Sequence, residues 1–238
     1  MKKPESKRSD CSIIIPVYNE EKTISDLLEY LQGFSCEILV VDGNPQQNTI
    51  NSISEKTIIK IAGPKGRGIQ LNMGARKAQG DILWFLHADT LPSPNALAHI
   101  KQIMRDQSIG SGAFYLRIDS EKVRYRLLEH GINLRSRVTR IPYGDQGIFM
   151  RKSFFEFIGG FPDVPIMEDV ALMRLVKRKG GRMCLLKEPI TTSARRWEHE
   201  GFLRCTLRNW WIRTLYYLGV HPTTLVKWYR DSGNHEKQ

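Results

Sequence analysis

The sequence predicts an α/β fold with an open, mainly parallel sheet flanked by helices and followed by a C-terminal helical extension. The first observation behind this prediction is a set of apolar runs without polar alternation, which is typical of strands covered on both faces. The second is that segments of helical spacing separate these runs, which implies right-handed crossovers between parallel strands. The third is that several runs end on an acidic residue, at the edge where open α/β sheets bind their ligands.

The N-terminal part of the chain supplies most of the predicted parallel sheet. Strands are expected at 12–17, 37–42, 57–61 and 81–86, with helices at 24–31 and 69–79 between them. Gly33 is expected to stop the first helix. The strands would therefore deliver residues 16–20, Asp42 and 87–89 to one edge of the sheet.

The pattern changes beyond Ser108, where the boundary between two halves of the chain is expected. Strands are predicted at 110–117 and 146–151, and helices at 121–139, 152–158, 168–179 and 202–218. In the helix 168–179 the apolar residues recur on one face, which indicates that this face is buried. The sequence contains no internal repeat and no low-complexity segment.

Composition limits the partners and the compartment. The net charge of +11 and the isoelectric point near 9.6 favour an anionic partner, such as a nucleotide, a nucleic acid or an acidic lipid surface. The four cysteines are far apart and form no metal-ligand spacing, so buried, reduced thiols and a cytoplasmic location are expected. Residues 1–10 are polar and lack the apolar segment of a signal peptide, so they are predicted to form a loose tail.

Two acidic motifs indicate chemistry. Asp89 follows the buried run 82–86, and the pair Glu168 and Asp169 begins a predicted helix. One acid that holds a divalent metal on a diphosphate and another that takes a proton from a hydroxyl would make a group-transfer enzyme. Each motif alone has a simpler explanation, because Asp89 can cap a turn and acids are common at helix N-termini.

Several motifs together carry a resemblance to a known family. In chain order they are Ile15-Pro16-Val17-Tyr18-Asn19-Glu20, Val40-Val41-Asp42-Gly43, Gly66-Arg67-Gly68, Leu71-Asn72-Met73-Gly74-Ala75, Leu86-His87-Ala88-Asp89, Gly159-Gly160-Phe161 and Glu168-Asp169. This order resembles the family 2 glycosyltransferases over nearly the whole chain. Tyr143-Gly144-Asp145-Gln146 and Ser193 to Glu198 are more narrowly similar to the transferases associated with radical-SAM and selenodomain proteins or with arsenosugar biosynthesis.

The resemblance implies a GT-A-type, Rossmann-like fold that binds a nucleoside diphosphate sugar, most simply a UDP-sugar. It divides the chain into a tail (1–10), a nucleotide-sugar-binding half (11–109), an acceptor-binding half of the same domain (110–200) and a C-terminal helical segment (201–238). The nucleotide-sugar-binding residues that it implies are Pro16, Tyr18, Glu20, Asp42, Arg67, Asn72, Ala88 and Arg196.

The family motif Asp-x-Asp, whose second acid binds Mn²⁺ or Mg²⁺, appears here as His87-Ala88-Asp89. Asp89 keeps the carboxylate that a hard metal requires. An imidazole at the other position tolerates Mn²⁺ better than Mg²⁺. The resemblance therefore implies a metal site at Asp89 and His87, although His87 can equally hydrogen-bond a loop.

The acceptor side follows from the same resemblance. Asp169 is expected to be the base of an inverting hexosyltransferase, and Glu168 is expected to orient an acceptor hydroxyl or to stabilise its loop. Asp145, Gln146 and Trp197 are the expected acceptor-binding residues. The acceptor is expected to be a small molecule or a lipid-linked compound.

Two other functions compete with this one. A nucleotidyltransferase of a related α/β fold would release pyrophosphate, and a basic nucleic-acid-binding protein would use the positive charge directly. The second is poorly supported, because the chain lacks a helix-turn-helix, a zinc finger and an aromatic RNA-binding motif, so no nucleic acid partner is expected.

The predicted helix 202–218 also has two interpretations. Its apolar residues recur at helical spacing with arginines between them, and they include Trp210 and Trp211. They either pack on the catalytic domain as core or lie on anionic lipid. The second interpretation would place a cytoplasmic protein peripherally at the inner face of the membrane.

Overall fold

A computed structural model of the chain describes residues 9–231. Most of the expected tail 1–10 and the last residues of the C-terminal segment, 232–238, lie outside the described residues. No helix in the described part of the chain is long and apolar enough to cross a membrane.

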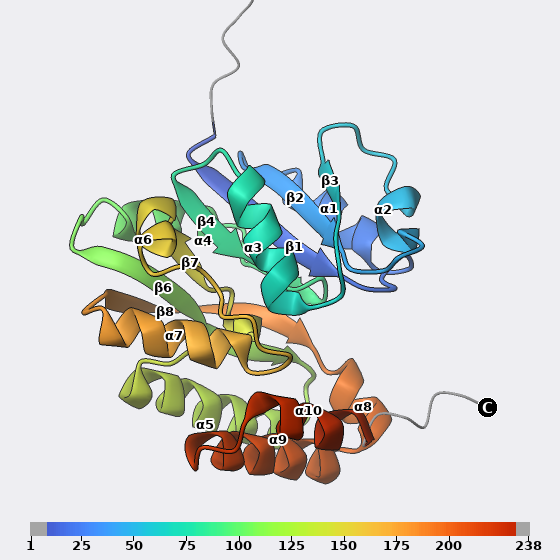
Figure 1. Cartoon of the computed structure of the whole chain (residues 1–238), viewed down its shortest axis with the longest axis vertical. Helices are drawn as coiled ribbons and strands as arrows, with labels where there is room; N and C mark the ends of the chain where they lie inside the picture. Colours follow the sequence, from blue (N-terminus) through green and yellow to red (C-terminus); the bar gives the residue numbers. More distant parts are fainter. Residues whose placement is uncertain (1–8, 232–238) are drawn as a thin grey trace, which may run out of the picture.

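One curved sheet of eight strands organises the molecule, in the order β3-β2-β1-β4-β7-β6-β8-β5 (Figure 1). The strands are β1 (Cys11–Val17), β2 (Glu37–Asp42), β3 (Ile59–Ala62), β4 (Ile82–Phe85), β5 (Thr90–Leu91), β6 (Ile109–Asp119), β7 (Phe149–Arg151) and β8 (Arg182–Ser193). The pairs β1/β2, β2/β3, β1/β4 and β6/β8 are parallel, whereas β7 pairs antiparallel with both β4 and β6. The predicted α/β class with a mainly parallel sheet is confirmed.

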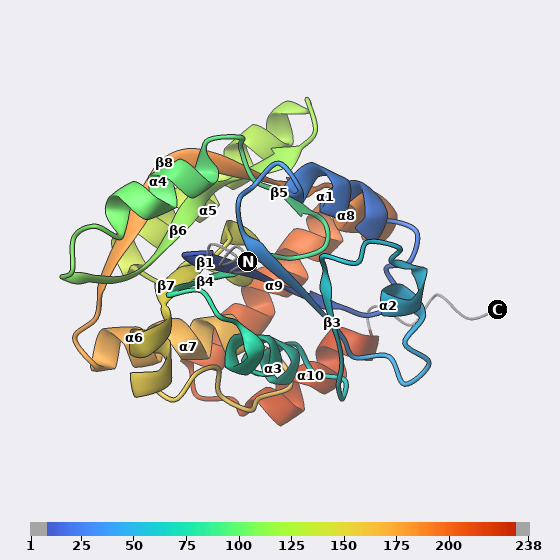
Figure 2. The same cartoon turned by 90° about the horizontal axis from the view of Figure 1, so that it is seen from above.

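Helices cover both faces of this sheet, as the view from above shows (Figure 2). They are α1 (Ile24–Leu31), α2 (Asn48–Ser52), α3 (Arg67–Lys77), α4 (Ala96–Ile103), α5 (Val123–Thr139), α6 (Lys152–Phe157) and α7 (Glu168–Arg178). One core lies between the sheet and α1, α4 and α5, and it contains the fully buried Trp84. A second core lies between the sheet and α3, α6 and α7.

The second half of the chain departs from the sequence expectations. The predicted strand 146–151 is shorter, because Gly144–Gln146 forms a 3-10 helix, η1, before β7. The long strand β8 runs parallel to β6 and was not predicted. Pro189 and a charged pair beside it interrupt its apolar pattern, and the register between β6 and β8 shifts next to Pro189.

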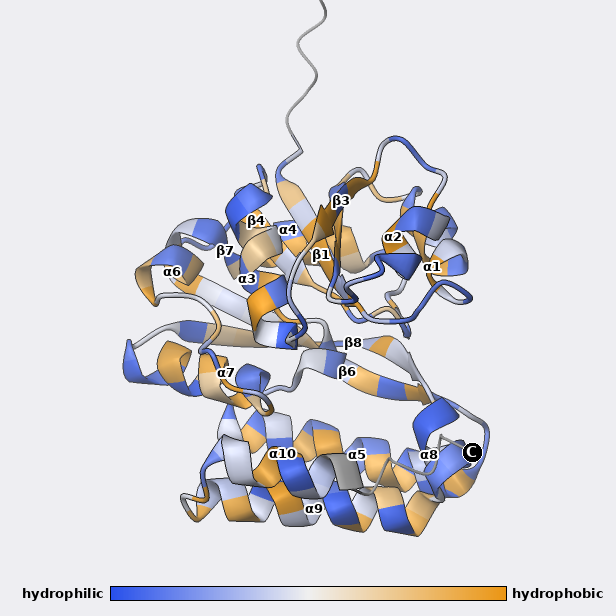
Figure 3. Ribbon diagram, turned by 45° about the vertical axis from the view of Figure 1, so that its right-hand side comes forward, coloured by the Kyte–Doolittle hydropathy of each residue, from blue (hydrophilic) through white to orange (hydrophobic). Residues whose placement is uncertain are grey.

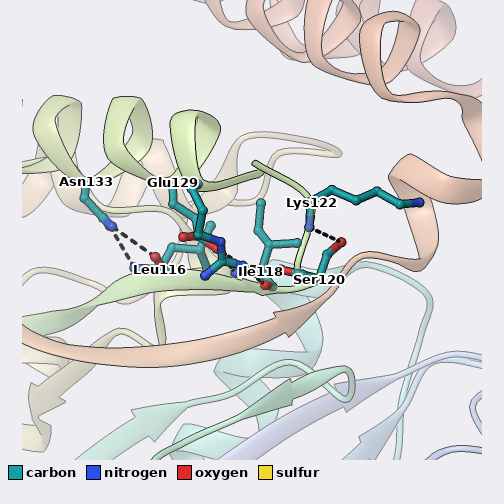
Figure 4. Close-up of polar contacts among 7 residues, drawn as sticks. Leu116, Ile118, Ser120, Lys122, Glu129 and Asn133 are labelled. Atoms are coloured by element: carbon teal, nitrogen blue, oxygen red, sulfur yellow. Dashed lines mark hydrogen bonds and ion pairs between the residues drawn. The ribbon is translucent and has the colours of Figure 1, made fainter. Parts of the chain in front are cut away.

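The polar face of α5 completes the free edge of β6 (Figure 4). Asn133 accepts from the backbone N–H of Leu116 at 2.7 Å and donates to its carbonyl at 2.9 Å. Glu129 accepts from the N–H of Ile118 at 2.5 Å, and Arg126 donates to the Ile118 carbonyl at 2.7 Å. These side chains satisfy backbone groups that would otherwise lack a partner strand.

Three helices close the described chain: α8 (Arg195–Glu200), α9 (Phe202–Tyr217) and α10 (Pro222–Asp231). The helix α9 matches the predicted range 202–218 closely. Of the two others, α10 packs against α9 and fully buries Leu225. The predicted C-terminal helical extension therefore contains one more helix than its sequence pattern indicated.

Candidate active site

The turn after β4 brings His87 and Asp89 to the edge of the sheet. Leu86 is fully buried, whereas Asp89 is exposed, and within residues 9–231 its carboxylate accepts only a 3.3 Å hydrogen bond from the hydroxyl of Thr90. Burial, together with the positive charges of Arg67 and Arg196, holds the pKa of His87 well below its usual value. His87 is therefore a neutral imidazole near neutral pH, which leaves a ring nitrogen able to accept a proton or bind a metal.

The first residues of α7 face this turn. The carboxylate of Asp169 accepts a 2.7 Å hydrogen bond from the backbone N–H of Gly144 in η1. A Cβ at Gly144 would lie 2.7 Å from Nε2 of His87 and 3.5 Å from Oδ2 of Asp169. The missing side chain of Gly144 thus lets three segments of the chain meet at one point.

Asp145 is the third acid at this point. Its Oδ1 is buried and has no hydrogen-bond partner among the described residues. Burial raises its pKa to about 6, and the negative charges of Asp169 and Asp89 act in the same direction, whereas Arg135 and Arg67 oppose the shift. The structure therefore brings the predicted acceptor residue Asp145 next to the predicted metal and base residues.

A salt bridge joins the start of α3 to the start of α7. Nη1 of Arg67 lies 3.0 Å from Oε1 of Glu168, whose side chain is 5% exposed while that of Arg67 is 45% exposed. The charge of Glu168 raises the pKa of Arg67, and burial raises the pKa of Glu168 against the effect of Arg67. Arg67 thus offers its remaining donors to solvent from the edge of the site.

Tyr229 of α10 is a site residue that the sequence analysis missed. Its hydroxyl accepts a 2.5 Å hydrogen bond from Nη1 of Arg196, and its ring lies 4.9 Å from the guanidinium of Arg208. It also contributes to the electrostatic environment of Arg67. No motif marks Tyr229, and only the packing of α10 against α9 brings it here.

The predicted nucleoside pocket lies at the end of β1. The ring of Tyr18 is 40% exposed, and Nζ of Lys65 lies 3.9 Å from its centre. Glu20 accepts a 2.6 Å hydrogen bond from Thr23 and lies 3.5 Å from Arg195. Tyr18 therefore offers an open aromatic face next to a cation, which suits a base with phosphates attached.

Asp42 stabilises the loop that follows β2 next to this predicted pocket. Its carboxylate is fully buried and accepts hydrogen bonds from the backbone N–H groups of Asn44, Thr49 and Ile50 at 2.8 to 3.2 Å. These bonds cap the N-terminus of α2 and fix the loop 43–48. The side chain of Asp42 thus shapes the loop, and its predicted contact with a nucleoside stays a prediction.

Three other predicted side chains point into the protein. The amide of Asn72 is bonded to both backbone groups of Phe161, at 2.8 and 2.9 Å. The amide of Gln146 is fully buried among protein partners, and the ring of Trp197 packs edge-on against Tyr125. The structure does not bring these three to the surface of the site, where they were expected to contact substrate.

The remaining two predicted residues are backbone positions. Pro16 lies within β1 opposite Val41 of β2, and Ala88 lies in the turn between His87 and Asp89, where it packs on the first core. Both help to form the sheet edge beside the site.

The side chains at this edge suit a metal that a substrate would help to hold. The described residues include no group of three or more His, Cys, Asp and Glu side chains placed to hold an ion by themselves. Mg²⁺ and Mn²⁺ in phosphate sites use one or two protein ligands and complete their shell with phosphate oxygens and water. The open carboxylate of Asp89 and the neutral imidazole of His87 fit that pattern.

The family of the chain is decided by its sequence. The model of a protein family described as "Glycosyl transferase family 2" matches residues 12–162, which include the site from Pro16 to Asp145. The chain belongs to glycosyl transferase family 2. Membership favours the glycosyl-transfer prediction over the nucleotidyltransferase and nucleic-acid-binding alternatives, and the narrower radical-SAM or arsenosugar subfamily stays a prediction.

Curated relatives extend this similarity. The chain is 28% identical over 233 residues to a "Probable glycosyltransferase YdaM" of Bacillus subtilis, covering 84% of this chain and 52% of the relative. It is 27% identical over 117 residues to a dolichol-phosphate mannosyltransferase of Pyrococcus furiosus, covering 44% and 33%. The chain thus spans at most about half the length of these two relatives.

Solved structures of glycosyltransferases share the fold. A mannosyltransferase from Pyrobaculum calidifontis, in complex with GDP-Man and Mn2+, superposes with a TM-score of 0.63 at 21% identity, covering 78% of this chain and 57% of that one. A glucosyl-3-phosphoglycerate synthase from Mycobacterium tuberculosis, in complex with Mn2+, UDP and its product, gives 0.57 at 15% identity, covering 76% and 70%. These similarities confirm the predicted GT-A fold.

Proposed function

We propose that the chain is an inverting hexosyltransferase that moves a sugar from a nucleoside diphosphate sugar to an acceptor hydroxyl, with Asp169 as the base. The observation that carries this proposal is that Asp169 and His87 lie against Gly144, while the charges of Asp169 and Asp89 both act on the adjacent Asp145. Neighbouring carboxylates of this kind can serve the two ends of a displacement. One receives the proton of the acceptor, and another lies beside the leaving diphosphate.

The transfer forms one bond, breaks one bond and moves one proton to Asp169. The acceptor oxygen attacks the anomeric carbon and gives its proton to Asp169, while the bond from that carbon to the diphosphate oxygen breaks. The nucleoside diphosphate leaves with the bonding electron pair. Because attack is in line, the configuration at the anomeric carbon inverts.

The leaving diphosphate requires positive charge. Arg67 and Arg196 both lie close enough to His87 for their positive charges to lower its pKa, beside the larger effect of burial. A Mn²⁺ or Mg²⁺ ion held by Asp89 and His87 would neutralise charge on the diphosphate oxygens. The Mn2+ present in the two related complexes supports a divalent metal as cofactor.

The nucleoside end would lie on Tyr18, with Lys65 and Glu20 at its border. We assign a UDP-sugar as donor, because the related glucosyl-3-phosphoglycerate synthase was solved in complex with UDP. The acceptor is proposed to be a small-molecule or lipid-linked hydroxyl compound.

A mass-spectrometric screen tests the proposal. The purified chain is incubated with a panel of UDP- and GDP-sugars and candidate acceptors, with Mn²⁺ or Mg²⁺, and the release of nucleoside diphosphate is measured. Release that depends on a nucleotide sugar and disappears in Asp169→Asn supports glycosyl transfer. Release of pyrophosphate from nucleoside triphosphates instead would show a nucleotidyltransferase and overturn the proposal.

A further inference from the structure

The helix α9 turns its apolar side away from the protein. The residues on its packed side include Cys205 and Ile212, which are 0% and 3% exposed. The opposite side carries large apolar side chains at helical spacing: Leu203 (71% exposed), Leu207 (61%), Trp210 (52%), Trp211 (61%), Tyr217 (45%) and Leu218 (76%). Of the two interpretations of this helix, packing of these residues as core is not what the structure shows, because each of them is 45% or more exposed.

The helix α5 also has an exposed apolar side. Its inward side packs Tyr125 on the first core and binds the edge of β6 through Arg126, Glu129 and Asn133 (Figure 4). Its outward side carries Val123 (73% exposed), Leu127 (71%), Leu134 (51%) and Val138 (73%). The described chain therefore leaves this outward apolar side largely uncovered.

The two helices lie together at the end of the molecule opposite β1 to β4 (Figure 1). The ring of Tyr125 on α5 packs edge-on against Phe202 on α9, with ring centres 5.3 Å apart. Figure 3 shows hydrophobic residues recurring along α9 at this end of the molecule. We call the outward residues of the two helices the α5/α9 face.

The charges around the α5/α9 face are mainly positive. Its exposed charged residues include Lys122, Arg124, Arg137 and Arg140 in or next to α5, Arg204 on α9, and the acid Glu121 next to Lys122. Within the two helices themselves the single acid is Glu129, which is 8% exposed and lies 3.0 Å from Arg126. The face thus combines tryptophan, tyrosine and leucine with an excess of arginine and lysine.

We propose that the α5/α9 face lies on the surface of an anionic lipid bilayer. Tryptophan and tyrosine rings favour the depth of the lipid headgroups, leucine and valine side chains enter the acyl boundary, and basic residues bind anionic headgroups. The excess of basic residues opposes packing of this face against the same face of a second copy, whereas it matches the charge of anionic lipid. The proposal does not rest on glycosyl transfer, because binding to lipid is measured without any substrate.

Flotation with vesicles tests the proposal. The protein is mixed with vesicles of phosphatidylcholine alone or of phosphatidylcholine and phosphatidylglycerol in equal amounts, at low and at high salt. We expect flotation with the anionic vesicles at low salt, and weaker flotation at high salt, since salt screens the attraction between charges. A protein that stays at the bottom of the gradient with anionic vesicles at low salt overturns the proposal.

Paired variants locate the contact. Trp210→Ser with Trp211→Ser, and separately Leu127→Ser with Leu134→Ser, should each lower the fraction bound by about tenfold. The matched control is Leu91→Ser on β5, which removes another exposed leucine (47% exposed) outside the face. An equal loss in the control would mean that binding does not use the α5/α9 face.

Two charge-reversal variants and a sedimentation measurement complete the test. Arg204→Glu should weaken binding to anionic vesicles, whereas Lys56→Glu, an exposed lysine outside the face, should not. Sedimentation of the protein without lipid reports its oligomeric state. A dimer that Trp210→Ser with Trp211→Ser dissociates, together with no flotation, would assign the face to a second copy and overturn the proposal.

Discussion

The backbone N–H of Gly144 donates a 2.7 Å hydrogen bond to Oδ2 of Asp169, and this contact joins η1 to the first turn of α7. It fixes the direction of a carboxylate that we assign as the base. Asp169→Asn keeps an oxygen that can accept this bond but removes the ability to take a proton. We expect turnover to fall by about a hundredfold or more while donor binding is nearly unchanged, as measured by steady-state kinetics and donor titration. If Glu168→Gln is the inactive variant and Asp169→Asn is active, the two roles are reversed.

We expect activity to depend on a divalent metal that Asp89 binds. Asp89→Ala removes an exposed carboxylate with few protein contacts, so the fold should be retained. Turnover should fall by a factor on the order of a hundred or more, and addition of Mn²⁺ should no longer tighten nucleotide binding. Isothermal titration with and without metal measures this coupling. Full activity of the unaltered protein in a chelator would contradict the assignment.

The salt bridge between Arg67 and Glu168 predicts a double-mutant effect. Arg67→Ala leaves the buried carboxylate of Glu168 without its cation, and it should lower the free energy of unfolding by about 1 to 2 kcal/mol, since half of Arg67 is already in solvent. Adding Glu168→Gln should restore most of that stability in a denaturant titration. Donor affinity should stay low in the double variant, because Arg67 is also assigned to the diphosphate. Recovery of donor affinity would restrict Arg67 to a structural role.

Asp145 predicts a pH dependence of stability. Its pKa of about 6 in the folded chain exceeds its ordinary value of 3.8, so the folded state holds this proton more tightly than the unfolded state. The resulting destabilisation is absent below pH 3.8 and fully present above about pH 6. In metal-free buffer, Asp145→Asn should therefore raise the free energy of unfolding at pH 7.5, by at most about 3 kcal/mol, with little gain at pH 4. An equal gain at both pH values would contradict this origin.

Gly144 predicts a steric effect on activity. In Gly144→Ala the new methyl group would lie 2.7 Å from Nε2 of His87, so the imidazole must move. We expect activity to fall by about tenfold or more, because small displacements of reacting groups cost rate. Gly131→Ala on α5 is the matched control, since nothing lies within 4 Å of its added Cβ. It should leave activity unchanged and raise stability by about 1 kcal/mol.

The sequence predicted the four parallel strands and two of the helices of the first half, whereas α2, β5 and α4 were not predicted. The strands β1, β2 and β4 are uninterrupted apolar runs, and such runs have few other uses in a folded chain. The strand β8 was not predicted, because Pro189 and the charges before it interrupt the apolar pattern of a strand. Its long pairing with β6 stabilises it as a strand, so tertiary contacts and not local composition determine its secondary structure.

The site was predictable where backbone geometry alone determines position. Asp89 lies just after the end of a strand, and Asp169 lies in the first turn of a helix. The positions of both are therefore determined by the elements next to them. The directions of Asn72 and Gln146 could not be predicted, because each is set by backbone groups of a segment distant in sequence. The position of Tyr229 depends on how α10 packs, which no local pattern encodes.

The insertion of β7 between β4 and β6 has a consequence for folding. The strand comes from the second half of the chain, yet it is the antiparallel partner of β4, whose residue Trp84 packs on Phe114 of β6. A chain cut near Ser108 would leave β4 with an open edge and Trp84 in water, so neither fragment has a complete core. The two halves should therefore melt in one cooperative transition and appear as a single calorimetric peak. Replacement of either half by a different one would therefore require new residues along the pairing of β4 with β7.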